Sequence, residues 1–208
     1  MPESKDKYHH GDLRVAVLNA AMTVLDEVGP QGLSIRAVAR RVGVSHTALY
    51  RHFKDRDELI LAAVEQGFLL LEQSMESEKG AVATDPLSQF AASGLAYVGF
   101  GLRNPSYYRV MFSGDLISNS GHVNLEHSSQ RTIIEMISNI SECQNLGVVR
   151  KGDPATQALT IMATLHGFVS MVIGNQVGHF IRDNQSTDTL RDAVLTHIFE
   201  GLGASATQ

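Results

Sequence analysis

Helical periodicity runs through the whole chain, and this pattern limits the possible fold more than any other feature. Apolar residues recur every three or four positions, for example at Leu13, Val17, Ala20 and Val24, and no segment shows sustained two-residue alternation. No Asn-Gly or Asp-Gly pair joins two β-branched runs, as a tight β-hairpin would require. We therefore expect an all-α protein.

Residues that cap or stop helices punctuate the first 60 positions: Gly29 with Pro30, Ser34, Gly43, Ser45, and Asp55 with Glu58. They predict a helix over 12–28, short helices after Ser34 and after Ser45, and a helix of about 20 residues after Asp55. Glycine and proline further along the chain predict helices over 86–103, 106–113, 122–146, 154–180 and 187–201.

Charge divides the chain into two parts. Residues 1–56 hold nine Lys and Arg against six Asp and Glu, whereas residues 57–208 hold eight against sixteen. We predict a small head domain over 1–56 and a larger body domain over 57–208. A basic head on an acidic body favours a polyanionic partner for the head, although a solvated charged face would give the same asymmetry.

The chain carries no strong signal for export or for membrane insertion. The single Cys143 cannot form an internal disulfide, and the charged N-terminus is unlike a signal peptide, so we expect a cytoplasmic protein. Residues 154–181 lack Asp, Glu, Lys and Arg for 28 positions, which is long enough to span a bilayer. The segment contains polar residues such as His166 and Asn175. A buried helix of a bundle or dimer fits it better than a membrane span, which stays the alternative.

Residues 35–53 have the spacing of a helix-turn-helix. The small Ala39 permits a close helix crossing and Gly43 suits the turn. The apolar positions Val38, Val42 and Leu49 would bury the inner faces. The polar and aromatic side chains left outside are the kind that read a major groove, although a purely structural helical hairpin could share the spacing.

Three segments resemble the DNA-binding head of TetR-family transcriptional regulators. They are residues 8–13 (YHHGDL), 33–45 (LSIRAVARRVGVS) and 48–59 (ALYRHFKDRDEL). The resemblance covers roughly residues 8–60. It implies a sequence-specific regulator that binds double-stranded operator DNA as a homodimer, most often as a repressor that a small effector releases.

The resemblance also implies which side chains meet DNA. Ser34 and Arg36 match positions where the family's second helix meets phosphate and the groove edge. Ser45, His46 and Thr47 match the N-terminal end of the recognition helix, where side chains reach bases.

Four further candidate positions come later in this segment. Tyr50 and His52 match phosphate-holding positions, although Tyr50 could instead pack on the first helix and His52 could be a plain surface histidine. Arg51 matches a position of varying type and could contribute to specificity. Lys54 matches the phosphate-binding lysine at the head of the fourth helix, where the helix dipole favours an anion.

The body resembles one subgroup of the family. Residues 103–113 (RNPSYYRVMFS) are similar to its sixth-helix segment, and residues 165–167 (LHG) stand where its Trp-His-Gly signature belongs, with Leu165 in place of Trp. We expect a largely apolar effector pocket with His166 as a polar anchor. The candidate lining is Tyr97, Phe100, Tyr107, Tyr108, Met111, Phe112, Met136, Met162 and Phe168. Plain core packing is the alternative for these residues and for His166.

The last two helices are expected to form the dimer interface. Small and apolar residues that suit close helix–helix approach recur there: Gly167, Ser170, Gly174, Gly178, Ala193, Val194 and Ile198. No phosphate-binding loop, nucleophile elbow or zinc-ligand spacing is present, and His122, Glu126 and His127 fit a surface cluster better than a metal site. We expect neither enzymatic activity nor a cofactor. The alternative is a helical ligand-binding or enzymatic body with a vestigial head.

Overall fold

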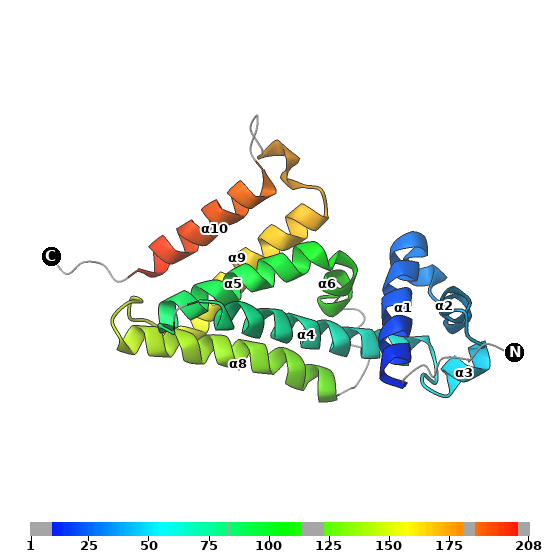
Figure 1. Ribbon diagram of the computed structural model, residues 1–208. Coiled ribbons are helices and arrows are strands. Elements are labelled where there is room, and N and C mark those ends of the chain that lie inside the picture. The colour runs from blue at the N-terminus through cyan, green and yellow to red at the C-terminus, as the bar shows by residue number, and fades with distance from the viewer. Residues whose placement is uncertain (1–9, 83, 114–122, 181–185, 204–208) are drawn as a thin grey trace, which may run out of the picture. The chain divides into compact units, whose positions relative to one another are not determined.

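The computed structural model describes residues 10–82, 84–113, 123–180 and 186–203, and over this part of the chain the fold is all-α (Figure 1). The helices are α1 (His10–Gly32), α2 (Ile35–Val42), α3 (His46–Tyr50), α4 (Arg56–Gly80), α5 (Pro86–Arg103), α6 (Pro105–Met111), α8 (Val123–Asn145), α9 (Pro154–Ile173), the short 3₁₀ helix η1 (Val177–His179) and α10 (Thr187–Leu202). No strand occurs among these residues, so the predicted fold class is confirmed.

The helices form two compact units. The first contains the described residues up to Gly67 together with α6, and the second contains Phe68–Pro105 and the described residues from Glu126 onward. This division of the packing differs from the head and body predicted as 1–56 and 57–208. The reason is that α4 contributes its first half to one unit and its second half to the other, while α6 packs with the N-terminal helices.

In the first unit, α1 packs on α2 and α2 packs on α3. Val38 and Leu49 are fully buried, and Phe53 closes the core after α3. The predicted stop at Gly29 is present as a kink, because Gly29 has a φ of 70° inside α1. Such a backbone conformation favours glycine, which explains why the regular helix cannot pass this point unchanged.

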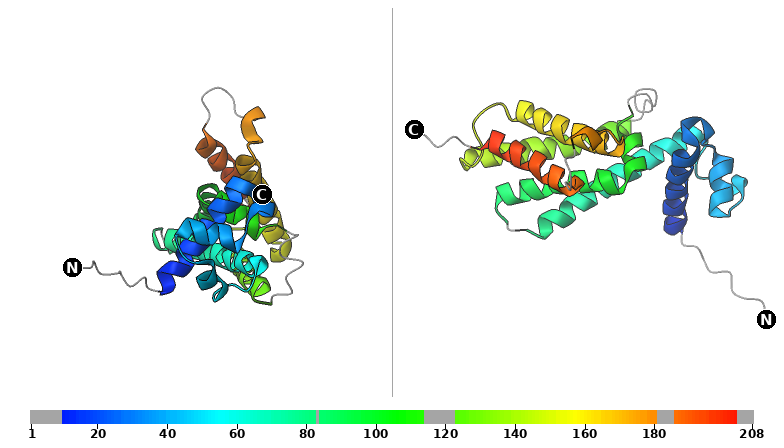
Figure 2. Two further views of the ribbon diagram at one scale, coloured as in Figure 1. Left: turned by 90° about the vertical axis from the view of Figure 1, so that its right-hand side faces the viewer. Right: turned by 90° about the horizontal axis from the view of Figure 1, so that it is seen from above.

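In the second unit, α5, α9 and α10 contact one another, and α9 and α10 run alongside each other in Figure 2. Two ion pairs join α4 to α8, between Lys79 and Glu135 and between Arg131 and Glu72. The end of α10 is tied to the loop after α8, because the Arg150 amide donates to the Leu202 carbonyl at 2.8 Å. This unit therefore encloses its own core, with Leu165 at 1% exposure and Ile140 fully buried.

The predicted helix over 154–180 was wrong at its C-terminal end, because α9 stops at Ile173. Asn175 takes a left-handed conformation with φ of 56°, and the Gln176 amide donates back to the Met171 carbonyl at 2.8 Å. Together with the bond from the Asn175 amide to Val172, this is a Schellman helix stop, with asparagine where glycine is more usual.

One described helix is long and apolar enough to cross a membrane by length and composition. It is α9, in which an 18-residue stretch has a mean hydropathy of 1.4 and is 33% buried. Helices in the core of water-soluble proteins pass the same test, so this feature by itself is weak evidence of a membrane span.

Candidate nucleic-acid interface

Local capping fixes the geometry of α2 and α3. The Ser34 Oγ accepts a hydrogen bond from the Ala37 amide at 3.2 Å, and the Ser45 Oγ accepts one from the Ala48 amide at 3.1 Å. Between the two helices Gly43 adopts the left-handed region with φ of 77°, and the Val44 amide donates to Ala39 at 3.0 Å. These are the start and stop positions that the sequence predicts.

Burial separates the packing residues of this segment from the candidate DNA-contacting residues. Ile35, Val38, Ala39 and Leu49 are at most 3% exposed, and they lie where α2 packs on α1 and α3 packs on α2. The candidates are all exposed: Ser34, Arg36, Ser45, His46, Thr47, Tyr50, Arg51, His52 and Lys54. The structure therefore places every predicted DNA-contacting side chain on the surface of one small unit, where a nucleic acid could reach it.

The start of α3 carries the two side chains predicted to read bases. His46 and Thr47 are the first residues of the helix, and nothing in the fold buries them. The His46 ring meets Tyr50 edge to face, with ring centroids 6.4 Å apart. Tyr50 is 48% exposed, so about half of its side chain is available to a partner.

Lys54 precedes the N-terminus of α4. The Asp55 carboxylate accepts a hydrogen bond from the Glu58 amide at 2.9 Å, and the Glu58 carboxylate accepts one from the Lys54 amide. The second bond reaches one residue further back than in the usual capping box. The Lys54 backbone is thus fixed just before a helix start, the end of a helix that favours an anion.

Two contacts that were not predicted from the sequence join α1 to α2 and to the residues that follow α3. Arg41 of α2 pairs with Glu27 of α1 through two hydrogen bonds, one of them at 2.8 Å between Nη2 and Oε1. This contact lowers the pKa of the Glu27 carboxyl through the hydrogen bond from Arg41. The Arg14 guanidinium lies over the Phe53 ring, 5.5 Å from its centroid. Neither pair has a helical spacing, so no periodic signal could have found them.

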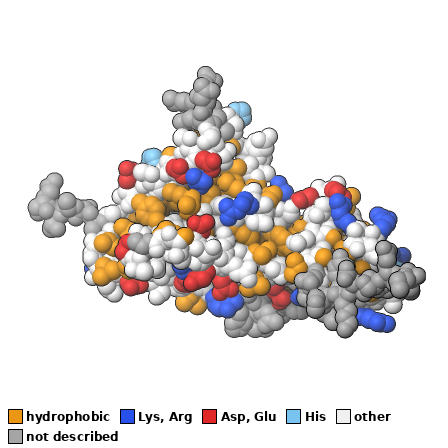
Figure 3. Space-filling view, in the orientation of Figure 1, with side chains coloured by type: hydrophobic (Ala, Val, Ile, Leu, Met, Phe, Trp, Pro, Cys, Tyr) orange, Lys and Arg blue, Asp and Glu red, His pale blue; other side chains and the backbone are white. Residues whose placement is uncertain are grey.

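The distribution of charged side chains agrees with a nucleic-acid contact at the first unit. On the face shown in Figure 3, Lys and Arg side chains project from the first unit, while most of the visible Asp and Glu side chains lie over the second. A polyanion would therefore be attracted to the unit that carries α2 and α3.

The second unit contains a narrow apolar cavity of about 20 Å³, enough for about one water molecule. Its lining comes from five helices: Met75 of α4; Phe90, Ser93, Gly94 and Tyr97 of α5; Glu135, Met136 and Asn139 of α8; Ile161 and Leu165 of α9; and Leu195, Ile198 and Phe199 of α10. Of the predicted effector-binding residues, the structure brings Tyr97 and Met136 together here.

The other predicted lining residues lie elsewhere. Phe100 is buried further along α5, and Met162, His166 and Phe168 lie on α9 without lining this cavity. Tyr107, Tyr108 and Met111 are buried in α6, which packs in the first unit, and Phe112 follows that helix. The α10 side chains were not among the predicted lining residues, because α10 was expected to serve dimerisation alone.

His166 is partly buried beside the cavity. Its Nδ1 lies 3.5 Å from the Tyr97 Oη, and its Nε2 lies 3.4 Å from the Ser170 Oγ. Burial lowers the pKa of the imidazole. These contacts fit a core histidine held by helix partners, the alternative given above, and through Tyr97 they place it one side chain away from the cavity.

Helix α6 binds α1 through polar groups. The Tyr107 Oη donates to the Asn19 Oδ1 at 2.8 Å, and burial raises the pKa of this phenol to about 12. Asp26 accepts from the Ser106 hydroxyl and pairs with Arg109. These contacts explain why Tyr107 is not available to an effector cavity in the second unit.

No metal site is formed by the described side chains: no group of three His, Cys, Asp or Glu lies close enough to hold an ion. His122 and the side chains of Glu126 and His127 lie outside the described part of the chain, as does Tyr8 of the first family motif.

Comparison with known proteins gives a consistent assignment. Residues 17–63 match the family model for bacterial regulatory proteins of the tetR family, and residues 90–197 match that for the tetracyclin repressor-like C-terminal domain. Neither description names the Trp-His-Gly subgroup, which stays a prediction.

Solved structures agree over nearly the whole chain. A protein of unknown function from Rhodococcus sp. RHA1 is 30% identical, with a TM-score of 0.80, covering 96% of this chain and 100% of that one. A TetR-like transcriptional regulator from the same organism is 16% identical (TM-score 0.69, 94% and 98% covered). The ketosteroid transcriptional regulator KstR2 of Mycobacterium tuberculosis is 15% identical (TM-score 0.68, 92% and 95% covered) and shares the fold. The chain belongs to the TetR family and is a DNA-binding transcriptional regulator.

Proposed function

We propose that this protein is a repressor that binds a palindromic operator as a homodimer and is released by a small effector. The observation that carries the proposal is the burial pattern of the helix-turn-helix. Every candidate DNA-contacting residue is exposed, whereas the apolar residues Ile35, Val38, Ala39 and Leu49 between them are buried. The protein would act in the cytoplasm, where the DNA is, and without a catalytic step.

Each exposed side chain has a role in this proposal. His46 and Thr47 read base edges in the major groove, with Ser45 fixing the start of their helix and Arg51 adding to specificity. Ser34, Arg36, Tyr50, His52 and Lys54 hold phosphates and set the register on the duplex. Phosphate contacts supply most of the salt-dependent affinity, and the base contacts supply the preference for one sequence.

Dimerisation through α9 and α10 is supported by what these helices leave uncovered. Leu159 of α9 is 70% exposed although α9 has a high mean hydropathy of 1.4, and a side chain added at Gly167 would meet open space. A second copy could cover this surface. Two copies would present two recognition helices, which must lie about 34–36 Å apart to enter successive major grooves.

The effector would bind in the cavity of the second unit and weaken operator binding. We infer that it acts through α4 and α5, since both helices line the cavity and both continue in the chain toward elements of the first unit. A coupling free energy of about 1–3 kcal/mol would change operator affinity about 5- to 150-fold.

A footprint on the DNA that flanks the protein's own gene tests this proposal. The expected result is protection of a two-fold symmetric sequence whose half-sites are about one helical turn apart. Protection without symmetry would contradict the dimer, and equal weak binding to every sequence would contradict sequence-specific repression at that site.

A further inference from the structure

The cationic side chains of the first unit fall into two groups. Arg41, Arg56 and Arg109 pair with carboxylates. The other described Lys and Arg side chains of this unit form no ion pair with a described residue: Arg14, Arg36, Arg40, Arg51 and Lys54. Cations without an internal partner are the ones that attract a polyanion most strongly. Of these, Arg14 and Arg40 do not belong to the candidate DNA-contacting surface.

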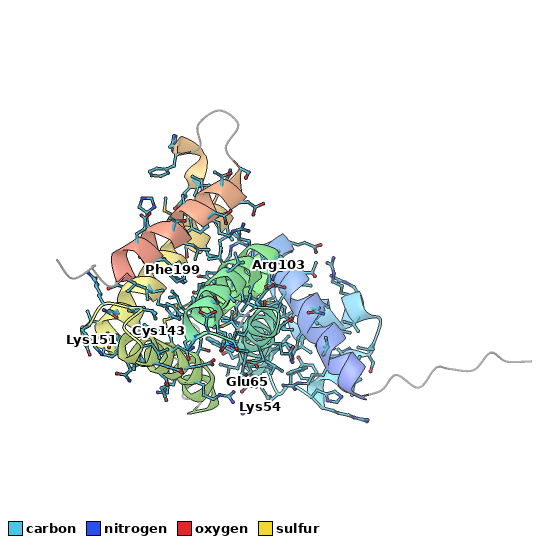
Figure 4. The ribbon with its side chains drawn as sticks, turned by 60° about the vertical axis from the view of Figure 1, so that its left-hand side comes forward. Lys54, Glu65, Arg103, Cys143, Lys151 and Phe199 are labelled. Atoms are coloured by element: carbon cyan, nitrogen blue, oxygen red, sulfur yellow. The ribbon has the colours of Figure 1, made fainter. Side chains whose placement is uncertain are left out.

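Arg14 lies next to two of the proposed phosphate contacts. Its guanidinium is over the Phe53 ring, with the carbon Cζ 5.5 Å from the ring centroid. The neighbours of Phe53 in the chain are His52 and Lys54, which are both exposed. Consecutive Cα atoms are about 3.8 Å apart, so the Arg14 charge lies close to the backbone from which these two side chains project. Figure 4 labels Lys54 at the lower edge of the view, near the start of α4.

The ring beneath Arg14 belongs to a well-held part of the unit. Phe53 is 2% exposed, and the amides of His52 and Phe53 both donate to the Leu49 carbonyl, at 2.8 and 2.9 Å. A guanidinium within about 6 Å of a ring centroid is attracted by the negative face of the ring. The Phe53 ring therefore limits the positions that the long Arg14 side chain takes, which reduces the entropy lost when the guanidinium binds a ligand.

The guanidinium of Arg14 keeps its hydrogen-bond donors for a ligand. Attraction to a ring needs no hydrogen bond, and Arg14 donates none to a described residue. The side chain is also exposed. A guanidinium carries five N–H groups whose fork matches two oxygens of a phosphate. Arg14 is thus suited to a phosphate that lies next to His52 and Lys54.

Arg40 occupies a different position. It lines a groove together with Val24 and Val28 of α1, at least ten residues further along that helix than Arg14. With a rise of about 1.5 Å per residue, the two positions are about 15 Å or more apart along α1. Arg40 therefore does not share the place of Arg14 beside Phe53.

We propose that Arg14 binds a phosphate of the DNA backbone adjacent to the one held by Lys54, and that the Phe53 ring holds the Arg14 guanidinium in position for this contact. The reading surface then includes the N-terminal part of α1 as well as α2, α3 and the start of α4. The contact rests on the proposed function only for where the DNA lies, and not on repression or effector release.

Salt dependence of DNA binding by the full-length protein is the first test. Arg14→Gln should weaken operator binding at least about fivefold at about 0.1 M salt and lower the slope of log affinity against log salt by about 0.9 per protomer. Arg150→Gln is the matched control, because Arg150 is an exposed arginine of the second unit that forms no ion pair with a described residue. It should leave both values unchanged. A wild-type slope in Arg14→Gln, shown to be folded by circular dichroism, would overturn the proposal.

Operator duplexes with single neutral phosphates locate the contact. A methylphosphonate replaces one charged phosphate at a time across the footprint. We expect one position in each half-site where this replacement weakens the wild type at least about threefold and has no effect on Arg14→Gln. Lys54→Ala should lose its sensitivity at a different position. Full wild-type sensitivity of Arg14→Gln at every position would mean that Arg14 binds no phosphate.

The role of the Phe53 ring has a separate test. Phe53→Leu keeps an apolar side chain in the core but offers no ring to the guanidinium. In this background, checked for folding by circular dichroism, Arg14→Gln should weaken operator binding by less than half of its factor in the wild type. The same factor in both backgrounds would overturn the positioning role of Phe53.

The two proposals fail in different ways. Phosphate contacts carry no sequence information, so the lower salt slope of Arg14→Gln should also appear on scrambled DNA. Equal binding of the wild type to operator and scrambled DNA would contradict the proposed function alone. An unchanged slope of Arg14→Gln on both DNAs, with operator preference intact in the wild type, would contradict the Arg14 contact alone.

Discussion

At the scale of single residues, the DNA-facing surface separates two kinds of contact. His46 lies on the first turn of α3, and Lys54 precedes α4, so they approach a duplex from different elements. Base contacts decide which sequence is bound, whereas phosphate contacts decide how strongly any duplex is bound. Substitutions at the two positions should therefore have different signatures.

We predict that His46→Ala removes most of the preference for operator over scrambled DNA, with a loss of about 1–3 kcal/mol on the operator alone. Lys54→Ala should weaken both DNAs alike and reduce the slope of log affinity against log salt by about one. Competition titrations at several salt concentrations measure both effects. An equal loss on both DNAs for His46→Ala would exclude its base-reading role.

His166 gives the stability of the protein a dependence on pH. Burial lowers the pKa of His166 below its ordinary value of 6.5, so the unfolded chain binds this proton more readily than the folded one. Stability from the neutral imidazole is therefore fully present above about pH 6.5 and declines as the pH falls from there toward the lowered pKa.

We predict that the melting temperature drops less between about pH 7.5 and about pH 5.5 in His166→Asn than in the wild type. The exposed His179 supplies the control substitution, His179→Asn, measured in the same buffers. A pH dependence in His166→Asn identical to that of the wild type would show that His166 does not carry this effect.

At the scale of elements, the turn between α2 and α3 depends on backbone conformation. Gly43 has a φ of 77°, and a Cβ there would contact no atom, so the cost of a side chain is conformational strain alone. We predict that Gly43→Ala lowers the free energy of unfolding by about 1–2 kcal/mol, whereas Gly43→Asn lowers it less, because asparagine tolerates the left-handed region. Urea denaturation compares the variants; equal losses would argue against strain as the cause.

The contact of α6 with α1 makes a second prediction at this scale. The hydrogen bond from Tyr107 to Asn19 joins them at 2.8 Å. Tyr107→Phe should cost about 0.5–1.5 kcal/mol of stability, and in a double-mutant cycle with Asn19→Ala most of this cost should disappear. Additive losses in the cycle would mean that the two side chains act independently.

The sequence predicted where helices start and stop better than which side chains of different helices contact one another. Ser34, Gly43, Ser45 and Asp55 cap helices as expected, because capping depends on residues within one turn of each other. The end of α9 at Ile173 was missed because Asn175, a less usual helix stop than glycine, takes the left-handed position.

The candidate DNA-binding surface was readable from the sequence, since its residues fall within about 20 positions and alternate with the buried skeleton at helical spacing. The cavity was not. Its lining combines Met75, Phe90, Met136 and Leu195 from segments far apart in the chain. Which apolar residues face one another across such distances depends on tertiary packing, which periodicity does not encode.

At the scale of the whole molecule, the proposed DNA binding and the proposed effector binding fall in two different compact units. The first carries the exposed reading surface, and the second carries the cavity and the apolar, largely uncovered α9. Helix α4 takes part in both, with Leu59 in the first core and Met75 at the cavity. Because α4 is continuous, a shift of this helix caused by an effector in the second unit would extend into the first unit.

Sequence-specific repression is tested by comparing binding of the protein to its footprinted site with binding to the same bases in scrambled order. Fluorescence anisotropy at about 0.1 M and about 0.2 M salt gives the affinities and their salt dependence. The proposed function requires at least about a thousandfold preference for the site, one dimer per site, and a steep loss of affinity with salt on both DNAs. Equal affinity for the two DNAs at both salt concentrations would contradict it.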